Sequence, residues 1–98
     1  MAKVSFSGAQ ELLAAYLSGE IDHHSAQELR QLIDTEIGAR MPAQLILDFG
    51  DVSFMDSSGV GLILGRARRM KALDGTVVVQ HTPPSIRKML DLAQIQYE

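Results

Sequence analysis

The 98-residue sequence predicts an α/β fold with a mixed, largely parallel β-sheet, an N-terminal hairpin and amphipathic helices packed on the sheet. Two short β-prone runs open the chain, three later segments carry apolar residues at helical spacing, and short apolar runs separate these segments. Alternating strands and helices favour right-handed crossovers, so the later strands are expected to be parallel. The length suits one hydrophobic core, and residues 1–98 are predicted to form a single domain.

The N-terminal hairpin is predicted from residues 4–6 and 11–17, which are both β-prone. Between them lies Ser-Gly-Ala-Gln at residues 7–10, and glycine with short polar residues suits a tight reversal. We therefore expect an antiparallel pair of strands that turns within residues 7–10.

The first helix is predicted to begin at Ser25, because Ser25 and Glu28 have the spacing of a capping box. In such a box each side chain satisfies the other residue's free backbone N–H group. Apolar residues then recur three and four positions apart, as on one buried helix face: Ala26, Leu29, Leu32, Ile33 and Ile37. Gly38 can take the left-handed conformation that ends many helices, so the helix is expected to end there.

A central strand is predicted at residues 45–47, Leu-Ile-Leu, between Pro42 and Gly50. A short apolar run without alternation is typical of a strand that is covered on both faces or lies at a sheet centre. A second helix follows, closed by Asp74-Gly75. Its apolar positions are Val60, Ile63, Leu64, Ala67 and Leu73.

A further strand and a third helix are predicted near the C-terminus. Residues 76–79, Thr-Val-Val-Val, are all β-branched, which favours a strand. Thr82-Pro83-Pro84 offers a cap and a proline for a first helical turn. The helix that follows has an apolar face made of Ile86, Met89, Leu90 and Ala93.

The composition argues against several classes of function. A net charge of −3 gives no overall attraction to nucleic acid or to anionic lipid, so direct DNA binding is not expected. No stretch approaches the roughly 18 apolar residues that span a bilayer, and no signal-peptide pattern opens the chain. The sequence has no cysteine and therefore no disulfide framework. We expect a cytoplasmic protein without a membrane partner.

The segment Phe54-Met55-Asp56-Ser57-Ser58-Gly59-Val60-Gly61 places two hydroxyl groups and a carboxylate where a strand ends and a helix begins. Helix N-termini carry free N–H groups and a partial positive charge, so a phosphate attached there is well accommodated. The same residue types are also ordinary helix caps. The string alone therefore supports both a structural turn and a modification site.

Enzymatic and metal-binding alternatives have weaker support in the sequence. Met55 stands where a serine-hydrolase elbow has its first glycine, and the loop lacks the lysine of a nucleotide-binding P-loop. The segment Asp22-His23-His24 contains metal-capable groups, yet consecutive residues point in different directions, so a polar loop is the simpler interpretation. We predict no catalysis, no cofactor and no metal.

Two further features are predicted to be simply exposed to solvent. The first is a basic run on the second helix, where cations suit the negative end of the helix dipole: Arg66, Arg68, Arg69 and Lys71. The second is His81, a lone histidine in a predicted loop.

Two segments together resemble a known family: SGEIDHHSAQELRQ at residues 18–31 and DVSFMDSSGVGLILGR at residues 51–66. They look like the anti-sigma factor antagonists of the STAS domain family. The Gly-Glu-Ile-Asp-His-His string is closer to the branch that acts on sigma F in sporulation than to the general-stress branch. The resemblance covers nearly the whole chain in order and spacing.

The resemblance implies a partner switch. In the family, the unmodified antagonist binds an anti-sigma factor and frees the sigma factor. The anti-sigma factor is itself a serine kinase that phosphorylates the antagonist, and a serine phosphatase removes the mark. The family's phosphorylated serine corresponds to Ser57, with Asp56, Ser58 and Gly59 completing the motif. The implied partner surface includes Asp22, His23, His24, Met55 and Gly61.

The chain departs from the family in one place. Family members continue past the third helix into a last strand and a terminal helix, whereas this sequence stops at Glu98. A last strand is compatible with the remaining residues, but the family's C-terminal helix is not. Two alternatives stay open: a partner switch of the general-stress or another circuit, and a regulatory domain derived from an anion transporter.

Overall fold

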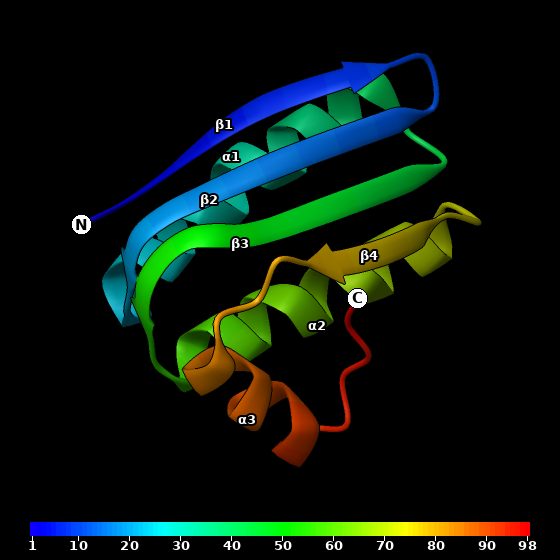
Figure 1. The fold of residues 1–98 in the computed structure, drawn as a ribbon. Coiled ribbons are helices and arrows are strands. Elements are labelled where there is room, and N and C mark those ends of the chain that lie inside the picture. Colours follow the sequence, from blue (N-terminus) through cyan, green and yellow to red (C-terminus); the bar gives the residue numbers. More distant parts are fainter.

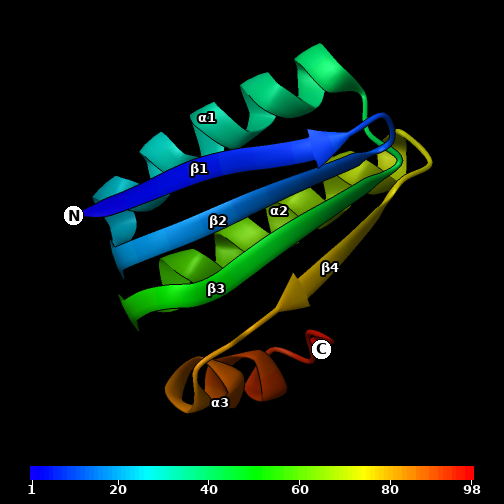
Figure 2. The same ribbon diagram turned by 45° about the horizontal axis from the view of Figure 1, so that its top comes forward.

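A computed structural model describes all residues from 1 to 98 and confirms the predicted α/β fold. Figures 1 and 2 show one four-stranded sheet with α1 and α2 side by side on one of its faces and α3 beyond the end of β4. The elements in chain order are β1 (Ala2–Ala9), β2 (Leu12–Ile21), α1 (His23–Arg40), β3 (Gln44–Met55), α2 (Ser57–Ala72), β4 (Thr76–Gln80) and α3 (Pro84–Leu92).

The sheet follows the chain order β1-β2-β3-β4. Strands β1 and β2 form the predicted antiparallel hairpin, and β3 lies parallel to both β2 and β4. Each parallel pair is joined through a helix, as crossover connections require. The carboxyl ends of β2 and β3 therefore meet at one edge, where Ile21 is paired with Met55.

One hydrophobic core lies between the sheet and the two long helices. Leu13, Leu45 and Val77 form one inward-facing row across three strands, and Ala15, Leu47 and Val79 form the next. Helix α1 covers these rows with Leu29, Ile33 and Ile37, and α2 adds Leu62, Ile63 and Met70. None of the helices combines the length and the apolar character that crossing a membrane demands.

The hairpin turns later than predicted. Pairing continues from Ser7 opposite Ala14 to Ala9 opposite Leu12, so the reversal lies at residues 10–11 rather than within 7–10. Gly8 serves close strand approach instead of the turn, because a Cβ atom at this position would lie 2.2 Å from the carbonyl oxygen of Leu12. Gly8 is therefore a strand residue and not a turn residue.

Both predicted ends of the first helix are wrong by two or three residues. Asp22 is the N-cap, and it forms the capping box with Ser25, so the Ser25–Glu28 box does not exist. The helix also runs past Gly38 to Arg40, and Met41 takes the left-handed conformation with φ of 47°. Pro42 follows directly and disfavours helical geometry in the residue before it, which explains the stop.

The central strand extends far beyond residues 45–47. It runs from Gln44 to Met55 and contains Gly50, which was predicted to end it. Its partner β2 accommodates the extra length through two register irregularities, after Tyr16 and after Gly19. The second half of β3 contains exposed polar residues and no continuous apolar run, so the sequence pattern does not predict that the strand continues.

The third helix and the last five residues also differ from expectation. Pro83 rather than Thr82 is the N-cap of α3, and no side chain caps this helix. Residues 94–98 form no strand, but the backbone N–H group of Glu98 donates to the carbonyl oxygen of Val79 at 2.8 Å. This bond leaves the C-terminus beside the free edge of β4.

Candidate functional site

The junction between β3 and α2 presents Ser57 at the surface. Met55 ends β3, Asp56 caps the helix, and Ser57 is its first residue and is exposed. Asp56 is held from both sides: its N–H group donates to the carbonyl oxygen of Ile21 at 3.1 Å, and its Oδ1 accepts from the N–H group of Ser58 at 2.8 Å. The turn is therefore fixed to the end of β2, while the Ser57 hydroxyl makes no hydrogen bond with another residue.

Gly59 allows this tight junction. A Cβ atom on Gly59 would lie 2.2 Å from Sδ and 2.3 Å from Cγ of Met55, closer than side chains approach in real structures. Met55 itself is only 4% exposed. Met55, which the family resemblance placed in the partner surface, thus lies beneath the turn and supports it from the core side.

The loop that was predicted around Asp22, His23 and His24 is the start of α1. The Oδ1 atom of Asp22 accepts from the N–H group of Ser25 at 2.9 Å, and the N–H group of Asp22 donates to Oγ of Ser25 at 2.9 Å. The N–H group and the hydroxyl group of Ser25 both donate to the Asp22 carboxylate, and these two bonds lower the pKa of Asp22. The Nε2 atom of His24 lies 3.0 Å from Oε1 of Glu28, one helical turn onward.

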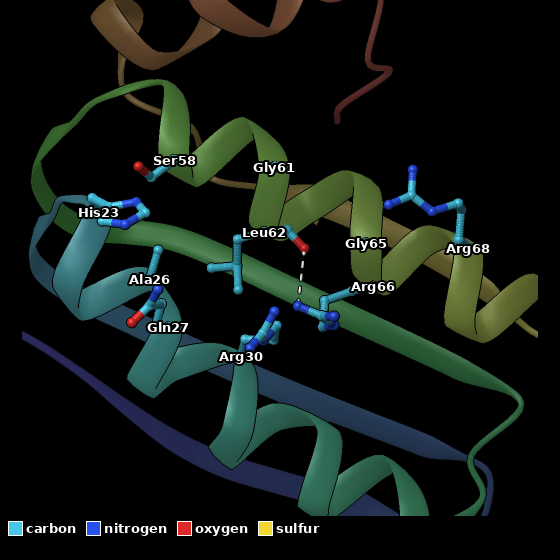
Figure 3. A pocket seen from close by; sticks show the side chains of 10 residues that line it. All are labelled: His23, Ala26, Gln27, Arg30, Ser58, Gly61, Leu62, Gly65, Arg66 and Arg68. Atoms are coloured by element: carbon cyan, nitrogen blue, oxygen red, sulfur yellow. Dashed lines mark hydrogen bonds between the residues drawn. The ribbon is translucent and has the colours of Figure 1, made fainter.

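The structure brings His23 and Ser58 to the same groove between α1 and α2. Figure 3 shows both side chains at one end of it, near the β3–α2 junction. The groove has a volume of about 260 Å³. Its lining is polar and basic: His23, Ala26, Gln27, Arg30, Ser58, Gly61, Leu62, Gly65, Arg66 and Arg68.

Arg66 contradicts the prediction that the basic run is simply solvated. Arg66 is only 6% exposed. Its Nε atom lies 2.8 Å from Oδ1 of Asp34 on α1, and this ion pair does not have the alignment of a hydrogen bond. Its Nη1 atom donates to the carbonyl oxygen of Leu62 at 3.5 Å. Burial lowers the pKa of Arg66, Asp34 opposes this, and the nearby Arg30, Arg69 and Arg68 lower it further.

The sequence patterns do not predict the α1–α2 groove, although the residues that line it recur at helical spacing on each helix. Positions 58, 61, 62, 65 and 66 share one side of α2, and positions 23, 26, 27 and 30 share one side of α1. Nothing in either segment alone says that the two sides face each other. The signal was a run of small residues and arginines at helical spacing on α2.

His81 is an exposed loop residue, as predicted, and it also contacts Asp48. Its Nδ1 atom lies 2.7 Å from Oδ2 of Asp48, which also accepts from Nε2 of Gln80 at 2.9 Å. Burial opposes ionisation of Asp48, but hydrogen bonds from Gln80, from the Gly50 N–H group and from His81 together lower its pKa. This cluster lies on the sheet, away from the β3–α2 junction.

The geometry at the two serines offers little for hydrolytic chemistry. Neither Ser57 nor Ser58 is hydrogen-bonded to a histidine: His24 pairs with Glu28, His81 pairs with Asp48, and His23 lines the same groove as Ser58 without a hydrogen bond to it. A serine nucleophile needs a nearby base to accept its proton. What the site offers is an accessible hydroxyl group at a helix N-terminus, with Phe54, 54% exposed, a few residues before it.

Known proteins share this architecture. The STAS domain family matches residues 4–98. The anti-sigma F factor antagonist of Lysinibacillus sphaericus is 36% identical over 84 residues, which are 86% of this chain and 72% of that protein. The anti-sigma-B factor antagonist of Bacillus subtilis (strain 168) is 29% identical over 80 residues, 82% of this chain and 72% of that protein.

Solved structures agree. The anti-sigma factor antagonist SpoIIAA in its unphosphorylated form has a TM-score of 0.85 at 32% identity, covering 98% of this chain and 88% of that one. The Bacillus cell fate determinant SpoIIAA in the phosphorylated form has a TM-score of 0.78 at 32% identity, covering 98% of this chain and 91% of that one. The chain belongs to the STAS domain family, and within that family it is similar to anti-sigma F factor antagonists.

Proposed function

We propose that this protein is a cytoplasmic anti-sigma factor antagonist that is controlled by phosphorylation of Ser57. Its unphosphorylated form binds an anti-sigma factor that is also a serine kinase, and this binding releases the sigma factor. Phosphorylation of Ser57 ends the binding, and a serine phosphatase restores it. The observation that carries the proposal is the exposed, unbonded Ser57 hydroxyl at the N-terminus of α2.

Ser57 is a better phosphorylation site than Ser58. Ser57 is exposed at the first helical position, whereas Ser58 is half-buried and faces the α1–α2 groove. The N–H group of Ser58 is already bound to Asp56. A kinase therefore has direct access to the first hydroxyl group and restricted access to the second.

A phosphate at Ser57 is compatible with the fold. It adds about 1.5 to 2 negative charges, which the positive end of α2 favours and the adjacent Asp56 opposes. The Ser57 side chain takes part in none of the bonds that fix the junction, so modifying it breaks none of them. The phosphate then acts by placing charge and volume inside the surface that the partner covers.

The proposed partner surface surrounds Ser57 on three elements. Phe54 at the end of β3 and Leu64 on α2, 54% and 41% exposed, supply apolar contact area. Gly61 lies one turn after Ser57, and no atom would come within 4 Å of an added Cβ atom there. Asp22, His23 and His24 contribute the neighbouring start of α1.

The names and forms of related proteins support this assignment. The relative from Lysinibacillus sphaericus is called an anti-sigma F factor antagonist, and SpoIIAA has been solved both with and without phosphate. The higher identity of the sigma F relative, 36% against 29% for the anti-sigma-B factor antagonist, favours the sporulation circuit over the general-stress circuit. The second circuit is the alternative.

The proposal is tested by incubating the chain with the anti-sigma kinase of its own organism and ATP, followed by mass spectrometry. We expect one phosphate on Ser57 and none on the Ser57→Ala variant, which should still bind the kinase. Phosphate on Ser58 in the unchanged chain would contradict the site assignment. If the chain neither bound nor was phosphorylated by any anti-sigma kinase of that organism, the function itself would be wrong.

A further inference from the structure

The α1–α2 groove concentrates positive charge in a chain whose net charge is −3. Arg30 on α1 and Arg66 on α2 point toward one another across the groove, as Figure 3 shows, and Arg68 lies on its α2 side. No Asp or Glu lines the groove. The one carboxylate that contacts Arg66 belongs to Asp34, which also lies 3.8 Å from Nε of Arg69.

Arg66 is incompletely neutralised by the protein itself. Its side chain is 7% exposed, yet its Nε atom has no aligned hydrogen-bond acceptor, and one carboxylate serves two arginines. A buried guanidinium group is stable when most of its donors are paired, and an anion placed beside it supplies the missing acceptors. Burial is the main reason that the pKa of Arg66 is lowered; Asp34 opposes this, and the neighbouring arginines lower the pKa further.

Glycines keep this groove open. No atom lies within 4 Å of the position that a Cβ atom would take on Gly61 or on Gly65, so side chains there would extend into free space. Ala26 keeps the facing side of α1 small. The resulting cavity of about 260 Å³ exceeds the volume of a single water molecule many times, and a side chain from another protein fits it.

The groove is also continuous with the proposed switch surface. Ser58 and His23 line one end of it, and Ser57 directly precedes Ser58 on the same helical turn. The groove is therefore within reach of a protein that covers Ser57. The positive charge of the groove favours acidic side chains on the part of that protein that lies against it.

We propose that the α1–α2 groove is a second recognition site for the anti-sigma factor and receives acidic side chains of that protein beside Arg30, Arg66 and Arg68. This inference rests on the proposed function and deepens it, because it names the chemistry of the contact next to the phosphorylation site. The groove gives the partner affinity and register, while Ser57 provides the switch. A phosphate on Ser57 does not need to enter the groove for the switch to work.

Charge reversal tests the groove directly. Arg30→Glu and Arg68→Glu, both at exposed positions, should each weaken binding of the anti-sigma factor by about tenfold at low salt. The loss should shrink in about 0.5 M NaCl, because salt screens exposed charges. Lys3→Glu is the matched control: it makes the same charge change on β1, outside the groove, and should alter the affinity less than about twofold.

A steric variant gives an independent reading. Gly65→Leu fills the groove from open space and replaces glycine in a helix with a better helix former, so the fold should keep or gain thermal stability. Binding should nevertheless fall by about tenfold or more. Replacing the contacting Asp or Glu of the anti-sigma factor with Lys should restore binding to Arg30→Glu.

The outcomes separate the groove from the proposed function. If the unchanged chain binds the anti-sigma factor and is phosphorylated on Ser57, but Arg30→Glu, Arg68→Glu and Gly65→Leu bind equally well, the groove proposal is wrong and the function stands. Binding of inorganic phosphate in the groove, together with unchanged anti-sigma affinity in these variants, would likewise overturn it by assigning the groove to a small anion. If the unchanged chain binds no anti-sigma factor, the proposed function fails first.

Discussion

The first turns of α1 and α2 have similar sequences, but they differ in whether a serine hydroxyl group is left without a hydrogen bond. Each follows a strand, each has an aspartate as its N-cap, and each carries a serine within the first three helical positions. In α1 the serine is Ser25, at the third position, where it is buried in a closed capping box with Asp22. In α2 the third position is Gly59, the box cannot close, and Ser57 remains unbonded at the first position.

In these two helices, the position of the serine at the helix start decides its role. At the third position the hydroxyl group reaches back to the N-cap and becomes part of the fold. At the first position it points outward, while the cap's carboxylate serves the next residue. The same local chemistry thus yields a structural serine in one helix and an accessible one in the other.

The largest expected effect comes from charging the open helix start. Ser57→Asp should weaken binding of the anti-sigma factor by about 2 to 5 kcal/mol, because it buries an unpaired charge in the interface. The fold should be kept, since a negative charge at a helix N-terminus stabilises the helix by about 0.3 to 1 kcal/mol. Ser7→Asp, at the opposite end of the sheet, is the control in calorimetric titrations. Equal affinities for Ser57→Asp and the unchanged chain would remove the proposed mechanism.

The next effect concerns the glycine that keeps the second start open. Gly59→Val should destabilise the protein by about 1 to 3 kcal/mol, because the new side chain collides with buried Met55. Gly61→Ala is the matched control two residues onward, where space is open, and should be neutral or stabilising by up to about 1 kcal/mol. Urea unfolding measures both. A Gly59→Val protein as stable as the control would show that the junction is looser than the structure implies.

A matched serine pair tests the contrast itself. Ser25→Ala removes the capping box and should cost about 1 kcal/mol of unfolding free energy. Ser57→Ala removes no internal bond and should change the unfolding free energy by less than about 0.5 kcal/mol. Thermal denaturation of the two variants side by side gives the answer. If both lost the same stability, the two helix starts would not differ as described.

The smallest effect lies in the acid range. The pKa of Asp22 is lowered in the folded state by the N–H and hydroxyl groups of Ser25, so the unfolded chain binds its proton first. The associated stability is present above the unfolded pKa of about 3.9 and is lost as the pH falls through the lower folded value. Asp22→Asn should flatten the fall in melting temperature below about pH 5, leaving the part due to Asp48. An unchanged slope would argue against the capping bond.

The architecture was predictable because periodicity reports on burial. The hairpin, the alternation of strands and helices and the parallel central strands all follow from apolar spacing, and so did the placement of Ser57 at the start of a helix. The exact ends were not predictable where two local signals compete. The spacing of Ser25 and Glu28 fits a capping box, but the box in the structure is formed by Asp22 and Ser25. Gly38 is of a residue type that often ends helices, but this helix ends only before Met41 and Pro42.

The α1–α2 groove and the Asp48–His81 contact depend on tertiary structure and lie beyond sequence patterns. Arg30 and Arg66 face each other only because two helices pack on the same face of the sheet. His81 is 33 positions from Asp48 and reaches it because β3 and β4 are neighbours. A single sequence shows which side chains are able to form such contacts, but it does not show which residues they contact in the fold.

The most direct test of the switch is the affinity of the stoichiometrically Ser57-phosphorylated chain for the anti-sigma factor, measured beside the unphosphorylated chain with circular dichroism of both. The expected result is a loss of tens to thousands of fold in affinity, on the order of 2 to 5 kcal/mol, with unchanged helix content. Equal affinity of the two forms would contradict the switch. Weak binding accompanied by loss of helix would show instead that phosphate unfolds the start of α2.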